Sequence, residues 1–121
     1  TLQAKAYDTS NNSTLSSSIS VTVSNTQDTT APVVVISAPL NGYITPRRSK
    51  SVVITTSATD NVAVSNIKIL IDGIVMTTCT GGSCSYTLNT RKVKVGSHTI
   101  TAVATDTSGN QASQSITVYK Q

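Results

Sequence analysis

Two cysteines, Cys79 and Cys84, are the residues best placed to form a covalent cross-link, with Gly81 and Gly82 between them. A Gly-Gly pair favours a tight turn, which predicts a hairpin with one cysteine on each strand, close enough for a disulfide. The spacing is longer than a C-x-x-C redox motif, and the other ligands of a zinc site are missing nearby. We therefore expect a structural disulfide and an oxidising compartment, the alternative being two free thiols in a cytosolic hairpin.

Residues that usually carry acid–base catalysis are scarce. All five acidic residues are aspartates, and His98 is the only histidine. His98 has no Cys, His or Glu neighbour in sequence, so we interpret it as a surface residue at the start of a strand. Serine is abundant, but no G-x-S-x-G nucleophile motif is present. The sequence therefore predicts that the chain is not an enzyme.

Side-chain oxygens that could bind a hard cation occur at three places in the sequence. Asp28 stands alone, Asp60 is followed by Asn61, and Asp106 is followed by Asn110. Ca²⁺ prefers oxygen ligands of these types. Asp and Asn also fix turns by bonding their own backbone, so a calcium site requires a fold that brings the three places together.

The composition indicates a sheet protein. Charged residues make up 12 % of the 121 residues, Phe and Trp are absent, and Thr, Ser, Val and Ile dominate. Three of these four types are β-branched and favour strands. No apolar run is long enough to cross a membrane as a helix.

The net charge of +4 comes mainly from two short basic clusters. A polyanion such as nucleic acid is one interpretation of clustered cations. Solubility and protection of sheet edges is the other, and we favour it because no Phe or Trp is available to stack on bases. No nucleic-acid partner is expected. The clusters are Arg47, Arg48 and Lys50, then Arg91, Lys92 and Lys94.

The two ends of the chain resemble each other, which reveals an internal repeat. Residues 1–12 match residues 99–110, and residues 19–22 match residues 116–119, at an offset of about 98 residues. That period is the size of one immunoglobulin-like sandwich. We therefore divide the chain into a closing hairpin of a preceding repeat (1–24), a polar linker (25–31) and a complete repeat (32–121).

Apolar residues alternate along seven segments of the complete repeat, which predicts an all-β, Ig-like antiparallel sandwich of about seven strands. The turn pair Asp72-Gly73 separates two of them. The expected strands are 32–37, 51–59, 64–71, 74–79, 84–90, 98–105 and 113–119, with a loop over 38–46. In such a sandwich Asp28, Asp60 and Asp106 meet at one pole, so calcium binding and simple turn formation both remain open there.

The hairpin segment 1–24 carries two apolar stripes that need a partner sheet, because a lone hairpin is marginal in water. The partner is expected to be a preceding repeat, a neighbouring identical subunit that receives the hairpin by strand addition, or nothing if the segment is a remnant. The stripes consist of Leu2, Ala4 and Ala6, and of Ile19, Val21 and Val23.

Several motifs together resemble the bacterial Ig-like domain family over residues 28–121. They are the segments 28–34, 37–42, 58–64, 71–73 and 96–110. The resemblance implies a non-catalytic module repeated in tandem on extracellular or cell-surface proteins. The Cys79–Cys84 pair departs from the family's usual pattern.

Two functions follow from this reading. The first is a structural repeat of a bacterial surface protein, adhesin or fibre, whose partners are neighbouring repeats or identical subunits. The second is an accessory module that binds polysaccharide for a secreted hydrolase. Tyrosine is the only aromatic residue, at positions 7, 43, 86 and 119. A coplanar exposed set would favour sugar binding, whereas scattered or buried tyrosines would favour the structural role.

Overall fold

The computed structural model describes residues 1–23 and 25–121 of the chain. Ser24, at the end of the predicted hairpin segment, lies outside the described residues. The main body is built almost entirely of strands, and its elements are β3 (Val33–Ala38), β4 (Ile44–Thr45), β5 (Ser51–Thr59), β6 (Val64–Ile71), β7 (Ile74–Thr80), β8 (Ser83–Asn89), the 3₁₀ turn η1 (Thr90–Lys92), β9 (Gly96–Asp106) and β10 (Gln111–Lys120). None of the described residues belongs to a helix of the length and apolarity that crossing a bilayer requires.

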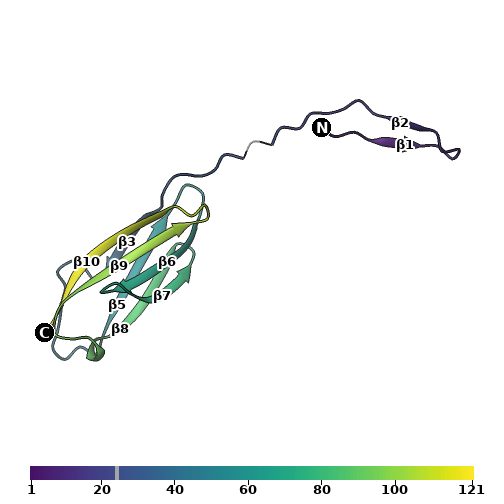
Figure 1. The fold of residues 1–121 in the computed structure, drawn as a ribbon. Coiled ribbons are helices and arrows are strands. Elements are labelled where there is room, and N and C mark those ends of the chain that lie inside the picture. Colours follow the sequence, from purple (N-terminus) through teal and green to yellow (C-terminus); the bar gives the residue numbers. More distant parts are fainter. Residues whose placement is uncertain (24) are drawn as a thin grey trace.

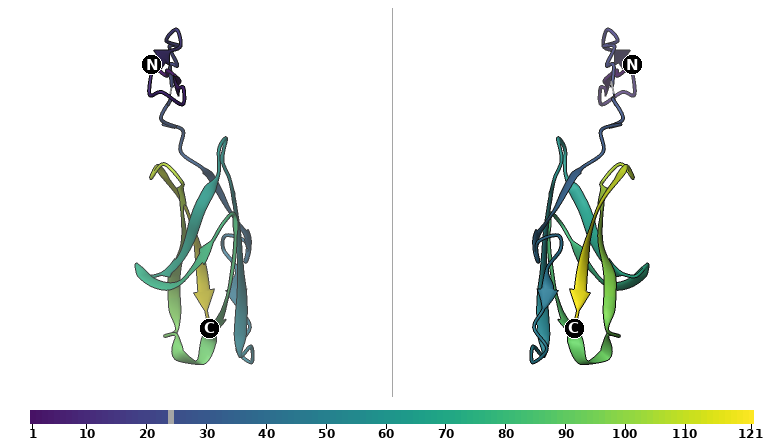
Figure 2. Two further views of the ribbon diagram at one scale, coloured as in Figure 1. Left: turned by 90° about the vertical axis from the view of Figure 1, so that its right-hand side faces the viewer. Right: turned by 90° about the vertical axis from the view of Figure 1, so that its left-hand side faces the viewer.

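Two sheets face each other across the core (Figures 1 and 2). One has the strand order β3-β5-β8, and the other has the order β4-β10-β9-β6-β7. The linker enters at one end of the sandwich, which we call the N pole, and β10 ends at the opposite end, the C pole (Figure 1). The predicted all-β sandwich is confirmed.

The core follows the period-2 pattern of the sequence. Because side chains alternate across a strand, every second residue of β9 points inward, and Ile100, Ala102 and Ala104 are at most 1 % exposed. Ile67 and Ile69 of β6 and Ile54 of β5 are completely buried. The alternation that the sequence shows along these strands thus places one face of each strand in the core.

The loop expected over residues 38–46 contains a strand that the sequence did not reveal. The two residues of β4 pair in parallel with Tyr119 and Lys120 of β10. A two-residue strand is too short to show alternation in the sequence. β4 pairs because its loop passes beside β10. Asn41 assists, because its Oδ1 accepts a hydrogen bond from the Thr117 N–H at 2.9 Å.

A disulfide joins Cys79 of β7 to Cys84 of β8, with their Cα atoms 5.4 Å apart. β7 belongs to the five-stranded sheet and β8 to the three-stranded one. The bond therefore ties the two sheets together at their open edge, and the Cys84 side chain is buried in the core.

The N-terminal segment forms a separate hairpin of β1 (Lys5–Tyr7) and β2 (Ser13–Leu15), which lies apart from the sandwich (Figure 1). Leu2 and Ile19 continue the pairing as an isolated bridge. All described residues of this hairpin are exposed.

We predict that the double substitution Cys79→Ser/Cys84→Ser lowers the free energy of unfolding by about 2 kcal/mol, because the bond closes only a short loop. For a domain of this size that corresponds to a fall in Tm of roughly 8–16 °C, measurable by thermal unfolding under non-reducing conditions. Wild-type protein treated with a reductant is the control and should show the same fall. An unchanged Tm in both samples would contradict the expected stabilisation.

Candidate functional site at the N pole

Asp106 is the most buried aspartate at the N pole, at 2 % exposure. Its Oδ1 accepts hydrogen bonds from the N–H groups of Ser108 and Asn110, both at 2.8 Å, and its Oδ2 accepts one from Asn110 Nδ2 at 2.7 Å. Burial by itself raises the pKa of the Asp106 carboxyl, but these hydrogen bonds outweigh it and lower the pKa. The carboxylate is therefore held ionised inside the turn that joins β9 to β10.

Asp60 occupies the turn between β5 and β6. Its Oδ2 accepts hydrogen bonds from the N–H groups of Val62 at 2.9 Å and Ala63 at 3.2 Å. Its other oxygen, Oδ1, is inaccessible to solvent and has no hydrogen-bond partner. One carboxylate oxygen thus fixes the turn and the other is left unsatisfied.

Asp28 brings the linker into the same place. Its Oδ1 accepts hydrogen bonds from the Thr30 N–H at 3.0 Å and from Asn61 Nδ2 at 3.1 Å, whereas its Oδ2 is buried without a partner. Asn110 Nδ2 also donates to the main-chain carbonyls of Asp28 at 3.1 Å and Thr30 at 3.2 Å. The linker is therefore fastened to the N pole on both sides.

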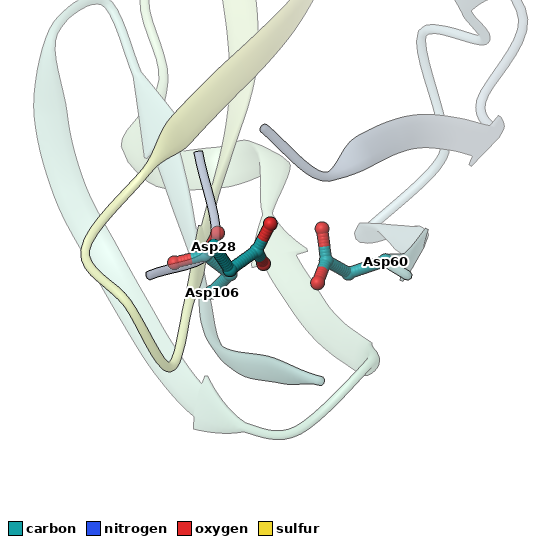
Figure 3. Close-up of side chains that lie close together, drawn as sticks. All are labelled: Asp28, Asp60 and Asp106. Carbon is teal, nitrogen blue, oxygen red and sulfur yellow. The ribbon is translucent and has the colours of Figure 1, made fainter. Parts of the chain in front are cut away.

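The three aspartates form a cluster, which we call the Asp triad (Figure 3). One carboxylate oxygen from each of Asp28, Asp60 and Asp106 lies within 4.8 Å of the others. Asn61 and Asn110, the other two candidate ligands, contact the triad through their Nδ2 groups and so act as hydrogen-bond donors.

The triad supplies three carboxylate oxygens of the type that Ca²⁺ prefers, out of the six to eight oxygen ligands that this ion takes. Three like charges held this close repel one another, and the unpartnered oxygens of Asp28 and Asp60 add the cost of unsatisfied burial. A hard cation coordinated by these oxygens would relieve both penalties. The residues that would hold it are Asp28, Asp60 and Asp106.

A charged pair at the C pole was not predicted from the sequence. His98 Nδ1 lies 2.7 Å from Asp72 Oδ2, and its Nε2 lies 2.8 Å from the Lys94 carbonyl oxygen. Both neighbours are acceptors, so both ring nitrogens donate only in the protonated imidazolium. The side chain of His98 is 12 % exposed rather than free on the surface as we expected. The pairing spans 26 residues of sequence, which explains why no local motif signalled it.

Five of the six stripe residues of the N-terminal hairpin occupy positions equivalent to buried core positions of β9 and β10, and the sixth, Val23, matches the half-buried Lys120. In the hairpin Leu2 faces Ile19, as Ile100 faces Ile116 in the sandwich. Leu2 and Ile19 are 66 % and 65 % exposed, whereas their counterparts Ile100 and Ile116 are 1 % and 8 % exposed. The remaining stripe residues, Ala4, Ala6, Val21 and Val23, are exposed as well.

The turn of the hairpin also copies the turn after β9. Asp8 Oδ1 accepts hydrogen bonds from the N–H groups of Ser10 and Asn12, both at 2.9 Å, and Asp8 Oδ2 accepts one from Asn12 Nδ2 at 2.8 Å. Asp106, Ser108 and Asn110 make the same three bonds. Register and turn therefore agree between the two hairpins.

The four tyrosines are scattered over the molecule. Tyr7 lies on β1 under the ammonium of Lys5, Tyr86 lies on β8 and packs against the core, and Tyr43 and Tyr119 are joined by a backbone hydrogen bond of 2.8 Å. The four come from three separate sheets or their flanking loops, which favours the structural role over a flat sugar-binding platform.

A family model described as Bacterial Ig domain matches residues 32–102, more than half of the chain. The chain therefore belongs to the bacterial Ig domain family. Such modules are typically non-catalytic and usually extracellular. No curated protein matches the sequence.

Two solved structures share the fold. A fibronectin(III)-like module of Clostridium thermocellum CbhA has a TM-score of 0.60 and 22 % identity, covering 74 % of this chain and 97 % of the module. An endo-beta-1,4-mannanase from Thermotoga petrophila has a TM-score of 0.61 and 14 % identity, over 78 % of this chain and 21 % of the mannanase. This chain thus spans about a fifth of the mannanase chain. At sequence identities this low, the structural similarity demonstrates a common fold and nothing about function.

We predict that the His98–Asp72 pair makes stability depend on pH. Its hydrogen bond to Asp72 raises the pKa of His98, against the effect of burial. The stabilisation by His98 is therefore complete below its unfolded pKa of about 6.5 and is lost as pH rises through the raised pKa. Urea unfolding of wild type and His98→Gln should differ by on the order of 1 kcal/mol at pH 5.5 and converge at pH 9.

Asp72 contributes to the pH dependence of stability in the opposite direction from His98. The hydrogen bond from His98 lowers the pKa of Asp72, so the contribution of Asp72 is lost only as pH falls through that lowered value. A difference between wild type and His98→Gln that grows from pH 5.5 to pH 9 would contradict this assignment.

Proposed function

We propose that this chain is a tandem Ig-like unit of a bacterial extracellular surface or secreted protein, acting as a stalk or fibre segment. The observation that carries the proposal is the duplicated hairpin. The β1–β2 pairs reproduce the register of β9 and β10, the Asp8 turn reproduces the Asp106 turn, and the hairpin residues equivalent to the core are exposed. A preceding repeat would cover them, which supports the division at residues 1–24, 25–31 and 32–121.

The linker geometry supports a load-bearing role. The Asp28 side chain and the Asn110 amide fasten the linker to the N pole, and β10 leaves at the C pole. A pull on the two ends therefore acts along the strands. Because β4 follows β3 along the chain and runs parallel to β10, a pull that reaches β4 through β3 shears the β4–β10 hydrogen bonds along the strands.

We predict that Asn41→Ala lowers the force needed to unfold the domain in single-molecule pulling, because Asn41 bonds the β10 backbone at Thr117. The matched control is Asn89→Ala, which removes the hydrogen bond from the Arg91 N–H to Asn89 Oδ1 at 3.0 Å, away from the β4–β10 contact. Each change should cost about 1 kcal/mol at equilibrium. Equal unfolding forces for the two variants would contradict the shear geometry.

Assembly through strand addition is the second form that this structural role could take. The exposed stripes of the N-terminal hairpin would then be covered by a neighbouring subunit. Light scattering and electron microscopy of the native chain separate the two forms. Long fibres would support strand addition, whereas a monomer of 12.6 kDa would leave the covalently preceding repeat as the cover.

We propose further that Ca²⁺ binding at the Asp triad stiffens the junction between linker and sandwich. The support is the pair of unpartnered carboxylate oxygens on Asp28 and Asp60 beside Asp106. A cation shared by the linker and two turns would restrict motion of the linker, which belongs to neither sheet.

Calcium at one hundred times its Kd should therefore raise the free energy of unfolding of the wild-type chain by about 2.7 kcal/mol, and with it the Tm. Asp60→Asn should abolish this response. Asp8→Asn, which removes a carboxylate from the same type of turn on the N-terminal hairpin, should keep it. The site would be refuted if calcium left the wild-type Tm unchanged, or if both variants lost the calcium-dependent rise in Tm equally.

A further inference from the structure

A groove of about 390 Å³ lies at the C pole, along the open edge between β7 and β8. Its floor is apolar and includes Met76 of β7 with Tyr86 and Leu88 of β8. Lys92 and Lys94 line the groove from the segment after β8, and both are exposed. At the other end of the same edge the disulfide between Cys79 and Cys84 holds the sheets together.

The groove has no deep extension. The next cavity inward, between Ile71, Leu88 and Ile100, has a volume of about 10 Å³, room for at most one water molecule. An acyl chain cannot enter there. An occupant must therefore lie along the groove, with one side on the apolar floor and the other toward solvent.

The electrostatics of the groove favour an anion. Asp72 is the only acidic residue of its lining, and its carboxylate is already paired with His98 at 2.7 Å. Lys120 donates a hydrogen bond to the carbonyl of Val93 and so adds a cation at the same end of the molecule. Neither of the two exposed lysines forms an ion pair with a carboxylate of the described residues.

We propose that this groove binds a segment of an acidic polysaccharide, with uronate carboxylates at Lys92 and Lys94 and the apolar face of a pyranose ring on Tyr86 and Met76. A linear sugar chain fits a shallow groove that is apolar below and cationic at its rim. Nucleic acid fits less well, because a single half-buried tyrosine offers no platform on which successive bases could stack. This binding activity goes beyond the stalk role proposed above.

The test uses the native chain and oligogalacturonate as the probe. Met76 is the only methionine of the sequence, so its methyl resonance is a single NMR reporter of the groove floor. We expect this methyl to shift on titration with oligogalacturonate. Neutral galactan oligosaccharides of the same length should produce no shift.

Two matched double variants separate groove binding from general attraction of a basic protein to a polyanion. Lys92→Ser/Lys94→Ser removes the charges that line the groove, and Arg47→Ser/Arg48→Ser removes the same net charge from exposed residues outside it. In affinity electrophoresis through gels that contain polygalacturonate, the lysine pair should weaken binding at least tenfold and the arginine pair less than threefold.

Three results would overturn the proposal. They are an unshifted Met76 methyl at saturating oligogalacturonate, equal weakening by the two double variants, and a Met76 shift produced equally by single-stranded DNA. A third variant, Ile74→Ser, guards against misfolding as an explanation. Ile74 lines the groove but is 68 % exposed, so its replacement should weaken polysaccharide binding and leave the Tm unchanged.

Discussion

The burial of the alternate side chains of β9 between the two sheets organises the domain. β9 pairs with β10 on one side and with β6 on the other, and its inward residues Ile100, Ala102 and Ala104 are almost fully buried. Two of these three are alanines, so the large isoleucines beside them on β6 and Ile54 of β5 in the opposite sheet can fill the space that the small side chains leave. A chain without Phe or Trp reaches a closed aliphatic core in this way. A larger side chain at the fully buried Ala102 would not fit this space without displacing its neighbours.

At the N pole, the turn between β9 and β10 both closes on the Asp106 carboxylate and holds the linker. The carboxylate of Asp106 closes the turn after β9, and Asn110 within that turn also holds the linker carbonyls. The same turn, built on Asp8, appears in the N-terminal hairpin. In the sandwich, the turn between β9 and β10 presents the Asn110 amide to the linker that precedes β3. One short segment thus ends a strand and also holds the linker.

Local patterns predicted the strands well, because period-2 burial and turn residues act over a few positions. Asp72 and Gly73 both adopt positive φ, at 50° and 81°, as their hairpin signal requires. The proximity of the three aspartates could be predicted only as a consequence of the sandwich. β4 could not be predicted, because two residues carry no period. The His98–Asp72 pair and the groove could not be predicted either, since each depends on the spacing of two sheets and on segments far apart in sequence.

The position of the disulfide has a consequence for the length that an unfolding domain releases. The bond between Cys79 and Cys84 encloses a separation of only 5 residues. About 90 residues of extended chain span on the order of 300 Å, and the closed loop withholds roughly 17 Å of that. The cross-link can therefore fasten the two sheets of the folded domain while leaving nearly all of its contour length available. In a stalk of such domains, each domain that unfolds under tension would extend to almost its full contour length with the disulfide intact.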